Sequence, residues 1–396
     1  MVSALALLIA NRATRTFGYG FTAVVLAIYL TLLGGSEAVV IATLSISLLS
    51  GAVLNVLVSH YGDRFGRRKA MVAFGLLMAA AGGILTVAPN FPIALVALFL
   101  GAASPTGTEV SPFLSIEQSI VAEVARQGHR TRAFAVYNLL GSLGASAGAL
   151  AAVPFMVRLG TNPASPDPLR PLFLLYAAIG LASALISVAL PATVELENRS
   201  NRVRLSAQSR SRLAKIAALF SVDSLAGGFV LQGFVSLWFF TKYPESVAYL
   251  GFIFAAAGVL SALSFLVAAR LGERIGLLET MVVTHLPSNL LLIAVPLAPS
   301  FLLALAAYLA RMALSQMDVP TRQAYLAGIV AREERTAANA LTNVARNTTQ
   351  AIGPVAAGAV IAAFGSSAPF FIGGGLKIAY DLAIFRAFRT IRPEET

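Results

Sequence analysis

A few ionisable side chains lie alone within long apolar runs, and they are the groups of this sequence that could do chemistry. Asp223 is one of them, and Arg311 and Arg346 are two others. A charge at membrane depth costs about 3 kcal/mol or more unless it is paired or hydrated, so each is a functional candidate. A carboxylate can carry a proton, and a guanidinium group can bind a carboxylate or a phosphate. We predict that Asp223 exchanges a proton and that Arg311 and Arg346 contact a ligand. A permanent ion pair between Asp223 and an arginine is the alternative.

Glu109 is a second candidate for both roles. It lies between Pro105 and Pro112, in the segment from Gly101 to Pro112. Proline interrupts a helix, and interrupted backbone at membrane depth has to line a cavity or be covered by protein. The segment is therefore predicted to be sharply kinked or partly non-helical, with Glu109 facing a ligand and able to exchange a proton.

The composition places these residues in a membrane protein. Charged residues make up 12% of the 396 residues and hydrophobic residues 57%, whereas about 25% of a soluble domain is charged. This excludes soluble enzymes, secreted proteins and DNA-binding proteins. The chain has no cysteine, and it lacks a GxxxxGK[ST] phosphate loop and an HExxH metal motif. We therefore expect no enzyme activity, no metal and no cofactor.

Twelve stretches are long and apolar enough to cross a membrane as helices, which requires about 20 residues each. The longest polar stretch, 193–212, divides them into six and six. The sequence predicts an all-α integral membrane protein with twelve transmembrane helices in two six-helix bundles, 1–192 and 213–396, joined by a basic cytoplasmic linker. The predicted spans are 16–34, 37–59, 70–88, 92–121, 133–157, 171–190, 213–240, 246–269, 277–297, 300–328, 336–364 and 367–388.

The basic residues orient these spans. Of the 29 Lys and Arg residues, the loops expected outside the cell hold only Arg158, Arg170 and Lys242. Because basic residues are retained on the cytoplasmic side, we expect both termini in the cytoplasm and the protein in the plasma (inner) membrane. The net charge of +11 then reflects topology and requires no nucleic-acid partner.

The two halves are related by an internal repeat. Gly66 matches Gly276 at an offset of 210 positions, and Gly148 matches Gly353 at an offset of 205. Membrane transporters are commonly built from such repeats. The change of offset gives the fourth span five more residues than the tenth, within the segment from Gly101 to Pro112.

The segment from Gly62 to Lys69, Gly-Asp-Arg-Phe-Gly-Arg-Arg-Lys, resembles the signature loop of the major facilitator superfamily. That signature has a Gly, three residues, Asp-Arg, one residue, Gly and basic residues, and Ser59 replaces its first Gly here. A degenerate copy, Arg270 to Gly276, lies at the related position of the second half. The resemblance covers the whole chain through its six-plus-six spans. It implies two six-helix bundles that rock about a central cavity, lined chiefly by the first, fourth, seventh and tenth spans.

The resemblance also implies a cytoplasmic gate at these loops. Asp63 is the only acid among basic neighbours and is expected to contact a basic residue or a helix N-terminus, while the basic residues face lipid headgroups. Glu117 and Arg322, which are repeat-related, are expected to form a salt bridge between the halves. The predicted gate comprises Gly62, Asp63, Arg64, Gly66, Arg67, Glu117, Glu273, Arg274 and Arg322.

Other polar residues of the spans are expected to be structural. Lys377 and Asp381 are four residues apart and can pair with each other. Asp318 is expected to pair locally, and His285, close to Pro287, is expected to be hydrogen-bonded at a kink.

Together these features indicate a secondary active transporter that moves a small organic solute by alternating access, coupled to protons and with efflux favoured. Uptake of an organic anion by symport is an alternative, which Arg311 and Arg346 would serve. A non-transporting membrane receptor is another. The expected partners are a small-molecule substrate and the lipid bilayer, with no nucleic acid, and we expect a monomer.

Overall fold

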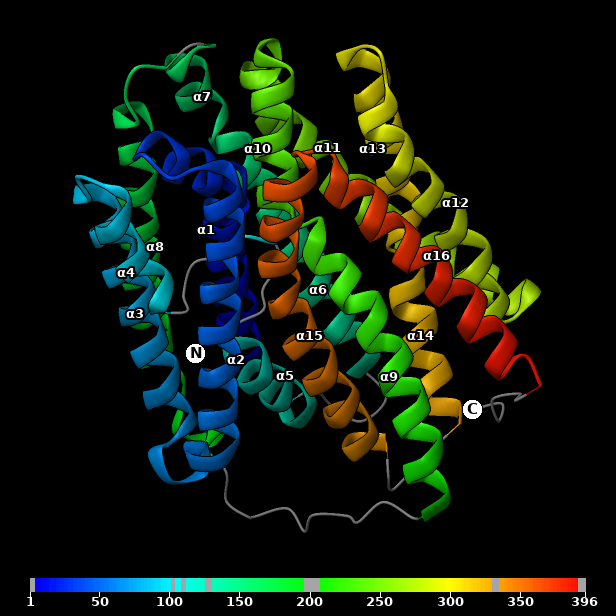
Figure 1. Cartoon of the computed structure of the whole chain (residues 1–396). Helices are drawn as coiled ribbons and strands as arrows, with labels where there is room; N and C mark the ends of the chain where they lie inside the picture. Colours follow the sequence, from blue (N-terminus) through cyan, green and yellow to red (C-terminus); the bar gives the residue numbers. More distant parts are fainter. Residues whose placement is uncertain are drawn as a thin grey trace. The chain divides into compact units, whose positions relative to one another are not determined.

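The computed structural model describes residues 4–100, 104–107, 112–124, 130–161, 163–195, 207–329 and 335–390 (Figure 1). Helices account for nearly all of this part of the chain, and it contains no strand. Within it, ten helical segments are long and apolar enough to cross a membrane. The predicted all-α membrane fold is therefore confirmed.

By its contacts the chain divides into two compact units, Met1–Arg199 with Leu231–Ala255, and Ser200–Val230 with Ala256–Thr396. The helices of the first unit are α1 (Ala4–Leu32), α2 (Glu37–Phe65), α3 (Arg67–Val87), α4 (Phe91–Phe99), α5 (Pro112–Val124), α6 (Arg130–Ala151), α7 (Val153–Leu159), η1 (Asp167–Leu169), α8 (Arg170–Val188), η2 (Ala192–Val194), α10 (Gln232–Lys242) and η3 (Pro244–Tyr249). Those of the second are α9 (Ala207–Phe229), α12 (Leu277–Leu297), α13 (Phe301–Ser315), α14 (Asp318–Gly328), α15 (Arg335–Phe364) and α16 (Ala368–Phe388), and α11 (Leu250–Ile275) begins in the first unit and ends in the second.

Each of the twelve predicted spans coincides with one helix or with two consecutive helices. The pairs are α4 with α5, α6 with α7, α9 with α10, and α13 with α14. The span predicted at 92–121 is interrupted, and the one at 336–364, α15, begins with a polar half that includes Asn343 and Arg346, so neither is among the ten apolar segments. The bundle boundaries at 1–192 and 213–396 stay predictions.

The signature segment contains a shorter turn than its sequence indicated. α2 continues through Gly62 to Phe65, and α3 begins at Arg67, so only Gly66 forms the turn, with φ of 92°. Gly276 separates α11 from α12 with φ of 97°. A side chain is strained at such angles, which explains why both copies of the repeat have glycine there.

The same helix pairs pack in both units. α1 packs against α6 and α3 against α8 in the first unit, and their repeat-related partners α9 with α15 and α12 with α16 pack in the second. Glycine allows the closest approaches: a Cβ atom at Gly148 of α6 would lie 1.9 Å from Phe17 O of α1, and one at Gly353 of α15 would lie 2.4 Å from Gly228 Cα of α9. The predicted repeat is therefore visible in the packing of each unit.

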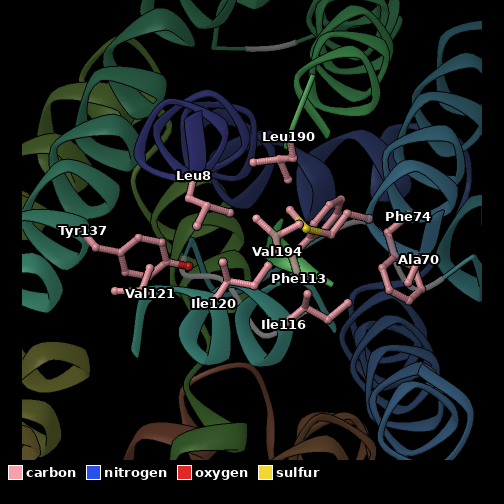
Figure 2. Packing of buried hydrophobic residues seen from close by; sticks show 11 residues of the cluster. Leu8, Ala70, Phe74, Phe113, Ile116, Ile120, Val121, Tyr137, Leu190 and Val194 are labelled. Carbon is pink, nitrogen blue, oxygen red and sulfur yellow. The ribbon is translucent and has the colours of Figure 1, made fainter. Parts of the chain in front are cut away.

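A buried apolar cluster holds α5 in the first unit (Figure 2). Phe113, Ile116 and Ile120 of α5 are each at most 4% exposed. They pack with Leu8 of α1 and Phe74 of α3 in the same cluster. The face of α5 that carries Glu117 is thereby buried within the unit.

Candidate functional site

Asp223 lies at the centre of a buried cluster of charges in the second unit. The residue is on α9 and is 4% exposed. Lys377 Nζ of α16 donates to its Oδ1 at 2.6 Å, and Arg346 NH1 of α15 donates to its Oδ2 at 3.2 Å. The carboxylate thus joins three helices through charged hydrogen bonds, which are the strongest kind between side chains.

A second pair adjoins this carboxylate. Arg322 NH1 of α14 lies 3.7 Å from Asp223 Oδ2 and donates to Asp318 Oδ2, one turn earlier on the same helix, at 2.5 Å. The local pairing predicted for Asp318 is confirmed. Arg322 is therefore shared between two carboxylates.

His285 connects Asp223 to a third carboxylate. Its Nε2 lies 3.9 Å from Asp223 Oδ1, and its Nδ1 lies 2.8 Å from Asp381 Oδ1. Asn289 Nδ2 donates to the other oxygen of Asp381 at 2.8 Å. His285 is hydrogen-bonded as predicted, and it lies between two acids on α12, which continues through Pro287.

We refer to these side chains as the Asp223 network. Its members are Asp223, His285, Asn289, Asp318, Arg322, Arg346, Lys377 and Asp381. With three acidic and three basic residues, its formal charge is zero when His285 is neutral and +1 when His285 is protonated. An imidazole, which is either neutral or positively charged, therefore lies between two carboxylates, an arrangement that can take up and release one proton.

The structure brings only some of the predicted residues together. Arg346 forms an ion pair with Asp223, which is one of the pairs proposed from the sequence. Arg311 contacts a different group: its NH1 donates to Met312 Sδ at 3.2 Å, and its buried Nε has no hydrogen-bond partner among the described residues. The predicted pair of Lys377 with Asp381 is wrong, because Lys377 reaches across to Asp223 while Asp381 is held by His285.

Sequence reasoning thus missed Lys377, Asp381 and Asn289 as members of the site. Lys377 and Asp381 are polar residues in an apolar stretch, which was a usable signal. Their spacing of four residues on one helix suggested a self-contained pair, and the true partners are 154 and 96 positions away in sequence.

A second buried ion pair lies in the first unit. Arg15 of α1 and Glu117 of α5, both 0% exposed, form two parallel hydrogen bonds of 2.9 and 2.8 Å. Tyr137 OH of α6 donates to Glu117 Oε2 at 2.6 Å. Glu117 and Arg322 thus each have a partner of opposite charge within their own unit, and the expected salt bridge between them stays a prediction.

The predicted interruption of the fourth span is confirmed in its described part. α4 ends at Phe99, Ser104 to Gly107 is non-helical, and α5 begins at Pro112. Pro105 O accepts a hydrogen bond of 2.9 Å from Gly233 N, at the start of α10. A break between α9 and α10 therefore adjoins this one, and the apolar run 213–240 gave no proline to predict it. Glu109 lies outside the described residues.

The profile of the Major Facilitator Superfamily matches residues 8–313 and 219–396. The chain belongs to this superfamily. Its members are transporters and not enzymes, so the protein is a multi-pass membrane transporter with a small-molecule substrate.

Similar proteins and structures agree with this assignment. The chain is 25% identical over 415 residues to the "Uncharacterized membrane protein YJR124C" of Saccharomyces cerevisiae, covering 96% of this chain and 92% of that protein. The structure of the nucleoside transporter NupG matches with a TM-score of 0.75 at 14% identity, over 98% of this chain and 100% of that one. The human organic anion transporter MFSD10 matches with a TM-score of 0.62 at 15% identity, over 96% and 98% of the two chains.

The superfamily's signature segment is anchored by a residue that the sequence did not single out. Glu195, after η2, accepts hydrogen bonds from Arg67 N at 2.8 Å and Arg68 N at 3.2 Å. These are the first amides of α3, where a carboxylate is favoured by unpaired N–H groups and by the helix dipole. The linker after α8 is thereby fixed to the turn at Gly66.

The remaining gate residues are described only in part. Glu273 and Arg274 are exposed at the end of α11. The backbone of Gly62, Asp63 and Arg64 lies in α2, and the side chains of the latter two are outside the described part. Their roles stay predictions.

Proposed function

We propose that this superfamily member is a proton-coupled secondary active transporter that moves a small organic solute by alternating access, with efflux favoured. The observation that carries the coupling is the Asp223 network. Buried charges in membrane helices are expensive unless they serve a function or are paired. This network keeps seven charged or titratable side chains in one place, on five helices of one unit.

The coupling step follows from the two strong bonds of Asp223. If the carboxylate takes up a proton, the charge that attracts Lys377 and Arg346 disappears, and both bonds weaken. The two cations are then able to turn to other groups, which changes how α15 and α16 are held to α9. A proton bound in one state and released in the other is the minimum that coupling requires. Glu109 is the second proposed proton carrier.

Arg311 is the proposed first contact for the substrate, with Arg346 and Glu109 as further ligand-facing residues. Arg346 is occupied by Asp223, whereas the buried Nε of Arg311 has no partner in the described part of the chain. A guanidinium group in a membrane helix that has no carboxylate bonded to it there suits an anionic or strongly polar substrate group. This observation favours the second candidate function, uptake of an organic anion by symport.

The gate is proposed at the cytoplasmic ends of the helices. Its residues are Gly66 in the turn between α2 and α3, and Gly62, Asp63, Arg64, Arg67, Glu273 and Arg274 at the helix ends beside the two turns. Glu117 and Arg322 support it within their own units. The distribution of basic residues supports a protein with both termini in the cytoplasm of the plasma (inner) membrane.

The test is solute flux in proteoliposomes with and without an imposed pH gradient, using a panel of nucleosides, organic cations and organic anions. We expect a gradient-driven substrate for the wild type. Asp223→Asn should abolish gradient-driven accumulation while retaining counterflow exchange of the same substrate. Lys242→Gln, an exposed lysine at the end of α10, is the control and should transport normally. Ligand binding without flux of any kind would contradict transport and would indicate the receptor function instead.

A further inference from the structure

We propose a binding site for one anionic phospholipid in a groove between α3 and α8, apart from the Asp223 network. The groove has a volume of about 470 Å³ and is lined by Arg68, Lys69, Val72, Ala73, Leu76, Val188 and Glu195. All of these residues belong to the first unit. Basic groups at one end and apolar side chains along the rest match a phosphate with an acyl chain attached.

Arg68 and Lys69 form the basic end. Arg68 NH2 donates to Val188 O at 2.9 Å, which fixes the guanidinium group against α8. A guanidinium group has five N–H donors, so this one bond leaves donors of Arg68 for a phosphate oxygen. Lys69 is exposed beside it and can supply a second positive charge.

Glu195 also borders the groove, and its negative charge would repel an anionic ligand unless other groups offset it. Both of its oxygens are taken by amides of α3, at Arg67 N and Arg68 N. The helix N-terminus, equivalent to about half a positive charge, partly offsets the charge of this carboxylate. The two basic side chains then leave the end of the groove positive.

The apolar wall continues from this end along one face of α3. Lys69, Val72, Ala73 and Leu76 are three or four residues apart, and such residues line one side of a helix. Leu76 is 51% exposed, and Val188 opposite is 54% exposed. Side chains of this kind in a membrane helix meet lipid chains.

The second unit has no equivalent basic pair, which makes the site particular to the first. The residues 210 positions after Arg68 and Lys69 are Leu278 and Glu279, and Glu279 is acidic. The basic pair is therefore not a consequence of the internal repeat. It is also not a consequence of the glycine turn, which the second unit has at Gly276. Its position at the inner leaflet, where anionic lipids are abundant, rests on the proposed orientation.

The test is lipid binding to the detergent-purified full-length protein by native mass spectrometry, titrated with phosphatidylglycerol or phosphatidylcholine. We expect one phosphatidylglycerol to bind in preference to phosphatidylcholine. Arg68→Gln and Lys69→Gln should each weaken that binding about fivefold, as one basic residue near a membrane surface contributes. Arg270→Gln removes an exposed basic residue of α11 and is the matched control, with unchanged affinity expected.

A second variant separates a lipid from a free anion. Ala73→Phe keeps the charges and fills the groove, so it should weaken phosphatidylglycerol binding at least as much as Arg68→Gln does. Glycerol phosphate, which has the headgroup alone, should compete only weakly. Equal affinity for glycerol phosphate, or unchanged lipid binding by a folded Ala73→Phe protein, would overturn the lipid site. Because no transport is measured, this result is independent of the proposed coupling.

Discussion

Lys377 Nζ lies 2.6 Å from Asp223 Oδ1, and the two side chains are 9% and 5% exposed. This bond joins α16 to α9 across 154 positions of sequence. Arg346 contacts the other oxygen of the same carboxylate, so Asp223 is bound on both sides. The relationship makes the last helix of the chain part of the proposed coupling site.

The first prediction concerns this bond. Lys377→Met should lower the free energy of unfolding by about 3 kcal/mol, because it leaves a buried carboxylate with one of its two close partners. The measurement is thermal or denaturant unfolding in detergent, with Lys242→Met as the exposed control. Asp223→Asn combined with Lys377→Met should cost less than the sum of the two single variants. Additive effects would contradict the pairing of these residues.

The second prediction compares two tyrosines. Tyr137 OH donates to Glu117 at 2.6 Å, whereas Tyr380 OH is buried and has no hydrogen-bond partner within the described ranges. Tyr137→Phe should therefore destabilise the protein by about 2 kcal/mol, the contribution of a hydrogen bond to a charged group. Tyr380→Phe should leave stability unchanged or raise it by about 1 kcal/mol. The same unfolding assay measures both, and equal losses would refute the assignment of Glu117 to Tyr137.

The fold could be predicted from the sequence more completely than the site. The length of an apolar stretch can be seen in consecutive residues, and it is enough to predict a membrane-spanning helix. Each predicted span coincides with helical structure since about 20 apolar residues have few alternatives in a membrane. The break near Pro105 was also predictable from its proline and glycine. The break after Phe229 was not, because it has no proline and becomes apparent only through its contact with Pro105.

Which residues form ion pairs depends on which helices pack together. Spacing along the sequence therefore suggested the wrong partners for several residues. Lys377 has a carboxylate four residues away and still bonds to Asp223. Arg15, which the sequence analysis did not single out, is buried against Glu117. Choosing among several acids and bases in different spans requires knowledge of which helices touch, and one sequence without that knowledge leaves every pairing open.

The third prediction concerns the close approach of α1 and α6. Gly148→Ala would place a methyl group 1.9 Å from Phe17 O, so the helices have to separate. We expect a loss of about 2 kcal/mol from this overpacking. Gly83 of α3 has open space around its Cβ position, and Gly83→Ala should increase stability by about 0.5 kcal/mol. We expect the two substitutions to change the free energy of unfolding in opposite directions. A Gly148→Ala protein of unchanged stability would argue against the close contact of α1 and α6.

The fourth prediction concerns the gate. Asp63→Asn should slow transport several-fold with normal expression and thermal stability, because it removes a charge contact that biases one cytoplasmic conformation. Glu245→Gln, an exposed acid of η3, serves as the control for loss of one negative charge. Normal flux through Asp63→Asn at normal expression would remove Asp63 from the proposed gate.

The last prediction concerns the proton. His285 contributes the imidazole of the Asp223 network, and an imidazole is either neutral or carries one added proton. It faces Asp381 and Asn289 on one side and Asp223 on the other, with the ring of Tyr380 against it. Around Asp223 lie Lys377, Arg346 and the Arg322–Asp318 pair. Protonation of His285 adds one positive charge to this set and strengthens the attraction of both neighbouring carboxylates, so the hold of α12 on α9 and α16 changes with pH.

Transport by the wild type should therefore depend on pH, and His285→Gln should flatten this dependence while keeping counterflow. Glutamine can still hydrogen-bond to Asp381, so the variant separates loss of the proton from loss of the contact. Asp381→Asn should weaken the same dependence, because it removes the charge that the imidazolium faces. His129→Gln changes another of the three histidines and should leave the profile as it is. An unaltered pH profile in a well-folded His285→Gln protein would assign the coupled proton to another group, and Asp223→Asn and Glu109→Gln would then be compared in the same assay.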